Sequence, residues 1–135
     1  MPLMTWNSRL SVGVEKLDEQ HHVLFEILND LHTAMMKGNA QSMTASLLKN
    51  LLEYTRTHFN IEEGLMARTS YPGIEAHRVQ HRALIAQVES YADRFERGEI
   101  TLNLHLLNFL RDWLTNHIQR VDHEYGPWMN ERGVH

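Results

Sequence analysis

The chain has no cysteine, which excludes disulfide bonds, thiolate metal sites and cysteine nucleophiles. It has no basic excess either: the formal net charge is −4, which argues against nucleic acids and anionic membranes as partners. No apolar run approaches membrane-spanning length. The opening stretch, MPLMTWNSRL, also lacks the charged head and apolar core of a secretory signal. These absences predict a cytoplasmic protein.

The length of 135 residues fits one domain, 1–135, with a core of its own. A hydrophobic content of 42% and a charged content of 22% are typical of globular proteins. Two-residue alternation with β-branched enrichment is missing, so no sheet is expected. What the sequence does have is histidine, ten of them, scattered along the chain and not gathered in a tract.

Apolar residues at steps of three and four predict four helices, at 18–37, 41–68, 74–97 and 102–120. Asp18 is expected to cap the first helix, and Gly38 with Asn39 to end it. The pair Pro72-Gly73 breaks the second from the third, and Gly126-Pro127 is expected to stop the fourth. Long helices with short connections favour an all-α, up-down-up-down antiparallel four-helix bundle. Residues 1–17 would form an irregular arm against it.

The apolar stripes of these helices carry polar residues where leucine would be expected: His21, His58, Glu62, His77, His81 and His117. Burial of so many polar groups without partners would cost several kcal/mol each at the upper end of the usual range, ~5 kcal/mol or more. A metal ion would give them one common partner, because it binds neutral imidazole and carboxylate together.

Two of these pairs, His58 with Glu62 and His77 with His81, have the i, i+4 spacing that points both side chains at one place. Each pair alone also fits a solvated helix surface, worth a few tenths of a kcal/mol, ~0.3. Inward polar groups on four separate helices together favour the metal site. At the first helix, steps of three and seven from His21 reach leucines, whereas His22 shares a polar row, so His21 is the inward residue.

The stretch HIQRVD, residues 117–122, adds Asp122 five positions after His117. In a regular α-helix this spacing turns the two side chains about 140° apart. Either the pair is unrelated, or the backbone changes course between them.

The set LDEQH ending at His21, HFNIE at 58–62, HRVQH at 77–81 and DWLTNHIQRVD at 112–122 resembles the hemerythrins, most closely the single-domain bacterial ones. The resemblance runs nearly end to end and implies two non-haem iron ions, bridged by Glu62, Asp122 and an oxo or hydroxo group. It places one iron on His77, His81 and His117, and the other on His21 and His58. Asp122 would then join the site from a distorted helix end, where one extra residue widens the turn.

The same resemblance implies reversible dioxygen binding for carriage, storage or delivery, without catalysis. The open coordination position would lie on the iron held by His21 and His58, in a pocket of Leu24, Phe59, Trp113 and Leu114. Tyr125 matches a tyrosine of the family that supports the ligands. Gln20 stands where some members have an acidic residue, which would alter the surroundings of His21.

The alternatives are a di-iron enzyme that reduces nitric oxide or peroxide or acts as a ferroxidase, and a stand-alone oxygen or iron sensor. Ferritin-type enzymes need two Glu-x-x-His motifs, and this chain has one, Glu19 to His22, which lies off the inward stripe. A zinc hydrolase is weaker still, since there is no His-Glu-x-x-His motif. The expected partners are dioxygen and a protein that consumes it, and the expected state is a monomer.

Overall fold

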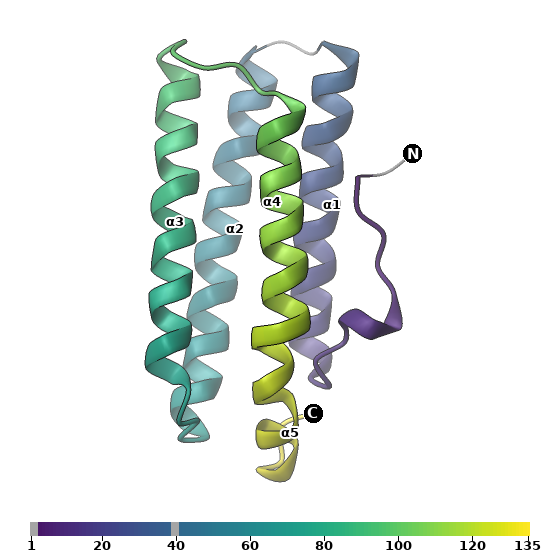
Figure 1. The fold of residues 1–135 in the computed structure, drawn as a ribbon, viewed down its shortest axis with the longest axis vertical. Coiled ribbons are helices and arrows are strands. Elements are labelled where there is room, and N and C mark those ends of the chain that lie inside the picture. The colour runs from purple at the N-terminus through teal and green to yellow at the C-terminus, as the bar shows by residue number, and fades with distance from the viewer. Residues whose placement is uncertain (1–2, 39–40) are drawn as a thin grey trace.

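Four long helices run antiparallel to their chain neighbours and enclose the core, as Figure 1 shows. The computed structural model describes residues 3–38 and 41–135, so Asn39 lies outside the described residues. Within them there are helices and no strands, which confirms the all-α bundle. The long helices are α1 (Glu15–Lys37), α2 (Gln41–Arg68), α3 (Ile74–Glu96) and α4 (Leu104–Asn116). None of the helices in the described ranges combines the length and apolar composition needed to cross a lipid bilayer.

The start of α1 differs from the prediction that Asp18 caps it. The helix begins at Glu15 after Val14, and no side chain caps it. Asp18 lies in its first turn and points back to the arm, where its carboxylate accepts hydrogen bonds from the Val12 amide at 2.8 Å and the Ser11 hydroxyl at 2.6 Å. A negatively charged carboxylate near a helix N-terminus also interacts favourably with the positive end of the helix dipole. Asp18 therefore fastens the arm and does not mark the helix boundary.

Two other helix ends, the start of α4 and the end of α1, follow ordinary capping rules. Helix α4 begins at Leu104, two residues after the predicted start at 102. Asn103 caps it, and the Asn103 side chain accepts a hydrogen bond from the Leu106 amide at 2.9 Å. Gly38 ends α1 with a φ of 64°, a left-handed conformation that glycine adopts without steric cost. These caps set the helix lengths that bring the inward stripes into register.

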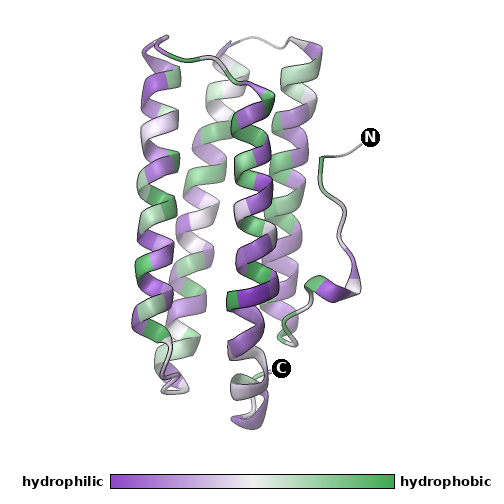
Figure 2. Ribbon diagram, in the orientation of Figure 1, coloured by the Kyte–Doolittle hydropathy of each residue, from purple (hydrophilic) through white to green (hydrophobic). Residues whose placement is uncertain are grey.

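Each long helix buries one stripe in the core, and Figure 2 shows hydrophilic and hydrophobic positions mixed along every helix. The fully buried large side chains of α1 comprise His21 and four leucines at the predicted inward spacing, Leu17, Leu24, Leu28 and Leu31. Full burial of a leucine stabilises the fold by about 2 kcal/mol. Helix α1 thus supplies much of the apolar contact around the polar cluster.

The end of the fourth helix differs most from the prediction. After Asn116 the chain forms a π-helical segment, η2 (His117–Asp122), and continues as α5 (His123–Glu131) with Pro127 inside it. Proline removes one backbone hydrogen bond from a helix, but burial of Tyr125, Gly126 and Met129 on α5 offsets that loss. The predicted stop at Gly126-Pro127 is therefore wrong.

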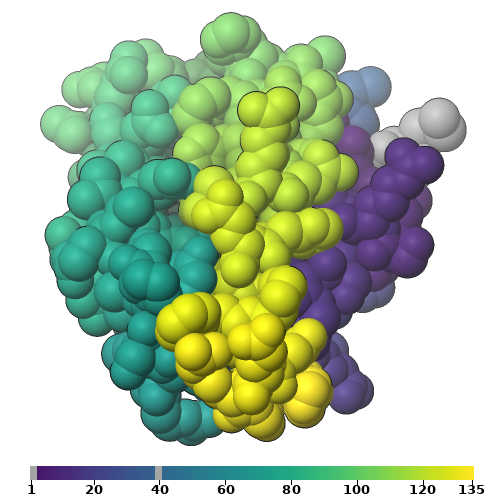
Figure 3. All heavy atoms as spheres, turned by 60° about the horizontal axis from the view of Figure 1, so that its bottom comes forward, coloured from purple at the N-terminus to yellow at the C-terminus, as the bar shows by residue number. Residues whose placement is uncertain are grey.

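The N-terminal arm lies against α1 and α5, and includes a 3₁₀ turn, η1 (Ser8–Leu10). Figure 3 shows α5 at this end of the bundle, between the arm and the chain around the α2–α3 turn. The Asn29 side chain of α1 holds the arm at Met4. It accepts a hydrogen bond from the Met4 amide at 2.8 Å and donates one to the Met4 carbonyl oxygen at 3.0 Å. Gly126 allows close contact lower down, because a Cβ there would lie 2.0 Å from the Val12 carbonyl oxygen. Arm and α5 together close the end of the bundle nearest the polar cluster.

Candidate metal centre

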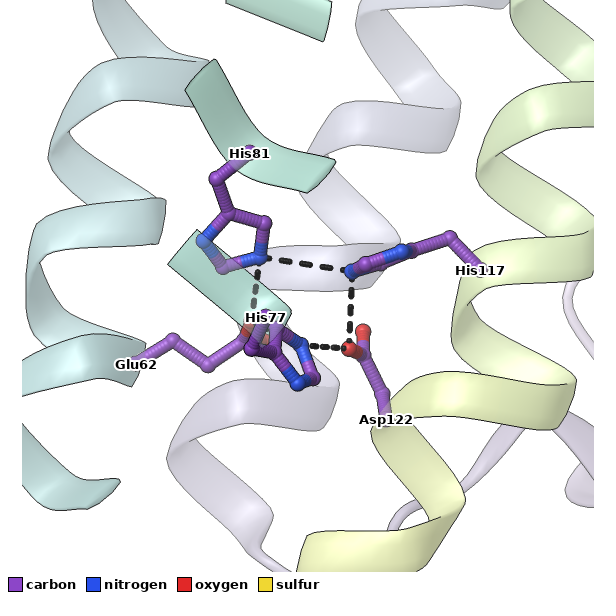
Figure 4. A group of neighbouring side chains, drawn as sticks. All are labelled: Glu62, His77, His81, His117 and Asp122. Carbon is purple, nitrogen blue, oxygen red and sulfur yellow. Dashed lines mark hydrogen bonds and ion pairs between the residues drawn. The ribbon is translucent and has the colours of Figure 1, made fainter. Parts of the chain in front are cut away.

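Seven polar side chains from the four sides of the bundle meet in its core. Helix α1 supplies His21, α2 supplies His58 and Glu62, α3 supplies His77 and His81, and η2 supplies His117 and Asp122. Each is at most 5% exposed. Figure 4 shows five of them pointing toward one another from three separate helices. The sequence-predicted set is therefore brought together without exception.

The side chains form two groups that share Glu62. The first group comprises Glu62, His77, His81, His117 and Asp122, and the second comprises His21, His58 and Glu62. Within each group the potential ligand atoms lie within 4.8 Å of one another. This is the division into a three-histidine side and a two-histidine side that the sequence resemblance implied.

Glu62 lies between the two groups and presents one oxygen to each. Its Oε2 is 3.2 Å from His21 Nε2 and 3.0 Å from His58 Nε2. Its Oε1 is 3.1 Å from His81 Nε2 and 3.5 Å from His77 Nε2. A carboxylate placed in this way can bridge two metal ions.

Asp122 repeats the arrangement from the opposite side of the site. Its Oδ2 is 3.2 Å from His21 Nε2, whereas its Oδ1 is 2.7 Å from His77 Nε2 and 3.0 Å from His117 Nε2. The π-helical segment makes this possible: its wider turn holds more residues than an α-turn. The backbone thus changes course between His117 and Asp122, as the distorted-end hypothesis required.

The histidines and carboxylates of the cluster shift one another's pKa values. Burial alone would raise the pKa of Glu62, but the imidazoles of His58, His21 and His77 lower it well below its usual range. Burial would lower the pKa of His77, and hydrogen bonds to Asp122 and Glu62 instead raise it to about 9. The same opposition raises the pKa of His21 to about 9. Without a metal, the carboxylates must therefore be neutralised by protons on the histidines.

Three histidines donate their outer ring N–H to a side chain at the edge of the site. His58 Nδ1 donates to Gln20 at 2.6 Å, and His117 Nδ1 donates to Gln80 at 3.0 Å. His81 Nδ1 donates to Glu63 at 2.8 Å. Gln20 was expected to affect His21, and the structure places it on His58 instead. Gln80 and Glu63 were not predicted, although each adjoins a ligand candidate in sequence.

These outer bonds decide what the inner nitrogens can do. A neutral imidazole that donates through Nδ1 has a lone pair on Nε2. His81 Nε2 and His117 Nε2 lie 3.3 Å apart, and both also face carboxylate oxygens. Glu62 Oε1 and His21 Nδ1 are buried atoms without a hydrogen-bond partner among the described residues. Lone pairs that face each other in a buried site need a shared cation, so the donor set fits metal ions.

Tyr125, the candidate supporting tyrosine, contacts Glu62 from α5: its hydroxyl donates to Glu62 Oε2 at 2.8 Å. Burial raises the pKa of this phenol well above its usual range, and the nearby Glu62 and Asp122 charges raise it further. Tyr125 therefore stays protonated and remains a donor. It fixes the orientation of the Glu62 carboxylate.

A small apolar cavity of about 20 Å³ lies in the bundle beside the cluster. Three of the four residues predicted to surround an open position line it, Leu24, Phe59 and Leu114. Trp113 does not. It lies one residue, and so about 100° of helix, away from Leu114, and its ring stacks on His117 at 4.5 Å between centroids. Trp113 thus packs against the three-histidine side.

Comparison with known proteins agrees with this geometry. The family model described as "Hemerythrin HHE cation binding domain" matches residues 12–129. The chain belongs to the hemerythrin family. Among curated relatives, the bacteriohemerythrin of Methylococcus capsulatus is 35% identical over 131 residues, covering 96% of this chain and 99% of that protein. A hemerythrin of Sipunculus nudus is 31% identical over 120 residues, covering 89% of this chain and 88% of that protein.

Solved hemerythrin structures have the same fold. The crystal structure of a wild-type hemerythrin superposes with a TM-score of 0.90 at 35% identity, covering 94% of this chain and 98% of that one. A hemerythrin variant, L114A, gives a TM-score of 0.91. The bundle, the arm and α5 are therefore features of the hemerythrin fold over nearly the whole chain.

Proposed function

We propose that this hemerythrin binds dioxygen reversibly at two non-haem iron ions, for carriage, storage or delivery, and that it is not an enzyme. The observation that carries the proposal is the position of Glu62 and Asp122, each with one oxygen toward His21 and the other toward the three-histidine side. Two carboxylates that face both ways suit a pair of ions better than one. The curated relatives, which are named bacteriohemerythrin and hemerythrin, support the same activity.

In this proposal the five histidines and two carboxylates hold the irons. The set is rich in imidazole, a ligand that suits iron as well as zinc and copper. His77, His81 and His117 would hold one ion, and His21 with His58 the other. Fewer protein ligands on the second ion leave it room for a small exogenous ligand. Bound ferrous iron supplies the electrons that dioxygen needs for reversible binding.

The other residues act by orientation and by exclusion of water. Gln20, Gln80 and Glu63 hold three imidazoles with Nε2 toward the site, and Tyr125 holds Glu62. Leu24, Phe59 and Leu114 line a space that admits a molecule of a few atoms. Its one polar lining residue, Thr55, already donates its hydroxyl to the Leu51 carbonyl oxygen. A small, largely apolar space beside the cluster favours dioxygen over larger or charged ligands.

The chief rival is a di-iron enzyme that reduces nitric oxide or peroxide. The ferritin-type version depends on a second Glu-x-x-His motif, and the one in this chain, Glu19 to His22, lies on the exposed face of α1. A cytoplasmic location, a monomeric state and a protein that receives the oxygen remain predictions from the sequence.

The decisive experiment loads the metal-free protein with ferrous iron without oxygen and then cycles it between air and argon while absorbance is recorded. Elemental analysis should give two irons per chain. Colour that appears in air, disappears under argon and returns over several cycles supports oxygen carriage. Continuous oxygen consumption with a reductant, or steady turnover of peroxide or nitric oxide, would favour the enzyme.

A further inference from the structure

The three outer hydrogen bonds of the cluster differ in charge. His58 and His117 donate to neutral amides, Gln20 and Gln80, whereas His81 donates to the carboxylate of Glu63. Hydrogen bonds to a charged acceptor are roughly twice as strong as neutral ones. His81 is therefore held differently from the two other histidines whose outer bonds the structure gives.

Glu63 is fixed from its outer side. The Arg78 guanidinium donates through Nε to Glu63 Oε1 at 3.2 Å, and its Nη1 donates to Glu75 at 2.6 Å. One oxygen of Glu63 thus binds Arg78 while the other binds His81. The Glu63 side chain is 21% exposed, so it connects the buried cluster to the surface between α2 and α3.

The His81 ring is also fixed on its face. Phe59 stacks on it with 3.6 Å between ring centroids and 3° between planes. Stacking controls the tilt of a ring, and an edge bond controls its rotation in the plane. Together, Phe59 and Glu63 leave His81 one orientation, with Nε2 toward Glu62 and His117.

We propose that Glu63 is a positioning residue that keeps the proton of His81 on Nδ1 and makes its Nε2 a stronger metal donor than the amide-bonded Nε2 atoms of His58 and His117. A carboxylate partner draws the Nδ1 proton toward itself and raises the electron density on the opposite nitrogen. An amide does this far less. The inference rests on the proposed metal site and assigns a specific asymmetry to its three-histidine side.

The test compares Glu63→Gln with two variants. Glutamine retains the length of Glu63 and can still accept from His81 through its single oxygen, so the change removes the charge and the bond from Arg78. Glu89→Gln is the matched control, because Glu89 lines the same surface hollow but pairs with Arg56, and no hydrogen bond or ion pair joins it to a histidine in the described part of the chain. Gln80→Glu is the converse, because it gives His117 the charged partner that only His81 has among the three.

The first readout is zinc affinity of the metal-free protein in competition with a chelator, which needs neither oxygen nor iron. Glu63→Gln should weaken zinc binding by about 10- to 100-fold, and Glu89→Gln should leave it unchanged. The second readout is the nitrogen-15 and proton spectrum of the histidine rings in the zinc-loaded protein. The His81 Nδ1 proton should be the most deshielded, and Glu63→Gln should move it toward those of His58 and His117.

The third readout is the reduction potential of the iron-loaded protein. Loss of the Glu63 charge should make it more positive, and Gln80→Glu should make it more negative. A wild-type chain that binds no metal would overturn the proposed function and this inference together. A wild type that binds metal, with Glu63→Gln unchanged in affinity, ring proton shifts and potential, would overturn this inference alone. A metal-loaded chain that fails to bind oxygen reversibly would overturn the carrier function and leave these readouts to decide the role of Glu63.

Discussion

Asp122 Oδ1 lies 3.0 Å from His117 Nε2, although the two residues are five positions apart in one continuous helical stretch. A regular α-helix would turn them about 140° apart. The π-helical segment closes this angle and leaves α5 in contact with the arm beyond it. One local change in helical pitch thus supplies a carboxylate to the site and the tyrosine that holds the other carboxylate.

Asp122→Asn is expected to lower the metal content of the protein without loss of helix. The substitution retains the shape of the side chain but removes the charge that faces His21, His77 and His117. The iron bound per chain should fall from two to one or none, as measured by elemental analysis after gel filtration, with circular dichroism as the check on folding. Asp112→Asn is the control, since Asp112 is exposed and bonds to Arg111. Full iron content in Asp122→Asn would contradict a bridging role.

The sequence predicted correctly those features that depend on the periodicity of a single helix. Inward histidines followed from steps of three and four, and the choice of His21 over His22 agrees with their burial, since His21 is buried and the His22 side chain is 54% exposed. The distorted turn before Asp122 was implied only by the family resemblance, which placed Asp122 in the site, where a regular helix could not bring it. Contacts between side chains of different helices could not be predicted in this way. Nothing in the spacing shows that Gln80 on α3 reaches His117 or that Gln20 on α1 reaches His58.

His58→Ala is expected to abolish reversible oxygen binding, because the two-histidine side would lose one of its histidines. Substitution of a large buried side chain by alanine also costs about 2–5 kcal/mol of stability, so folding should be verified by circular dichroism first. The measurement is absorbance over repeated cycles of air and argon. The control is His22→Ala, which removes the exposed histidine that follows His21 in the sequence and should behave as wild type. Full, repeatable oxygenation of His58→Ala would show that the assignment of this residue is wrong.

Stability of the metal-free protein should decrease as the pH rises from about 6.5 to about 9. The pKa values of His21 and His77 are raised from 6.5 to about 9. A raised pKa stabilises the fold below the unfolded value of 6.5, and that contribution is lost as the pH passes through about 9. Each pKa unit corresponds to roughly 1.4 kcal/mol. Urea unfolding of chelator-treated protein at intervals across this range measures the decrease.

The metal-loaded protein should respond to pH in the opposite sense. Protonated imidazole cannot bind a metal, so acid should release the ions and lower the stability that they supply. The pH dependence of stability should therefore have opposite signs in the two forms, because the same histidines bind protons in the metal-free protein and metal in the loaded protein. Metal content that stays constant well below the ordinary histidine pKa would contradict the proposed ligands.

The two helix boundaries that the sequence predicted wrongly depend on contacts with other segments of the chain. Gly126-Pro127 is a helix-ending pair by local rules, yet α5 continues through it because Tyr125 and Met129 are fully buried. Asp18 is a good capping residue by type, yet it binds the arm. Burial on α5 and hydrogen bonds from the arm to Asp18 outweigh local preferences worth only about 1–3 kcal/mol.

Gly126→Ala is expected to destabilise the protein by about 1–3 kcal/mol, because the new methyl group would lie 2.0 Å from the Val12 carbonyl oxygen and force the arm away from α5. Gly64→Ala is the matched control: Gly64 is an exposed glycine inside α2 with open space around its Cβ position. There alanine should stabilise the helix by about 0.5–1 kcal/mol. Urea unfolding of both variants measures the difference. Since α5 also carries Tyr125, displacement of this contact should weaken iron binding in Gly126→Ala and leave it intact in Gly64→Ala. Equal stability of the two variants would mean that the arm does not pack against α5 in solution.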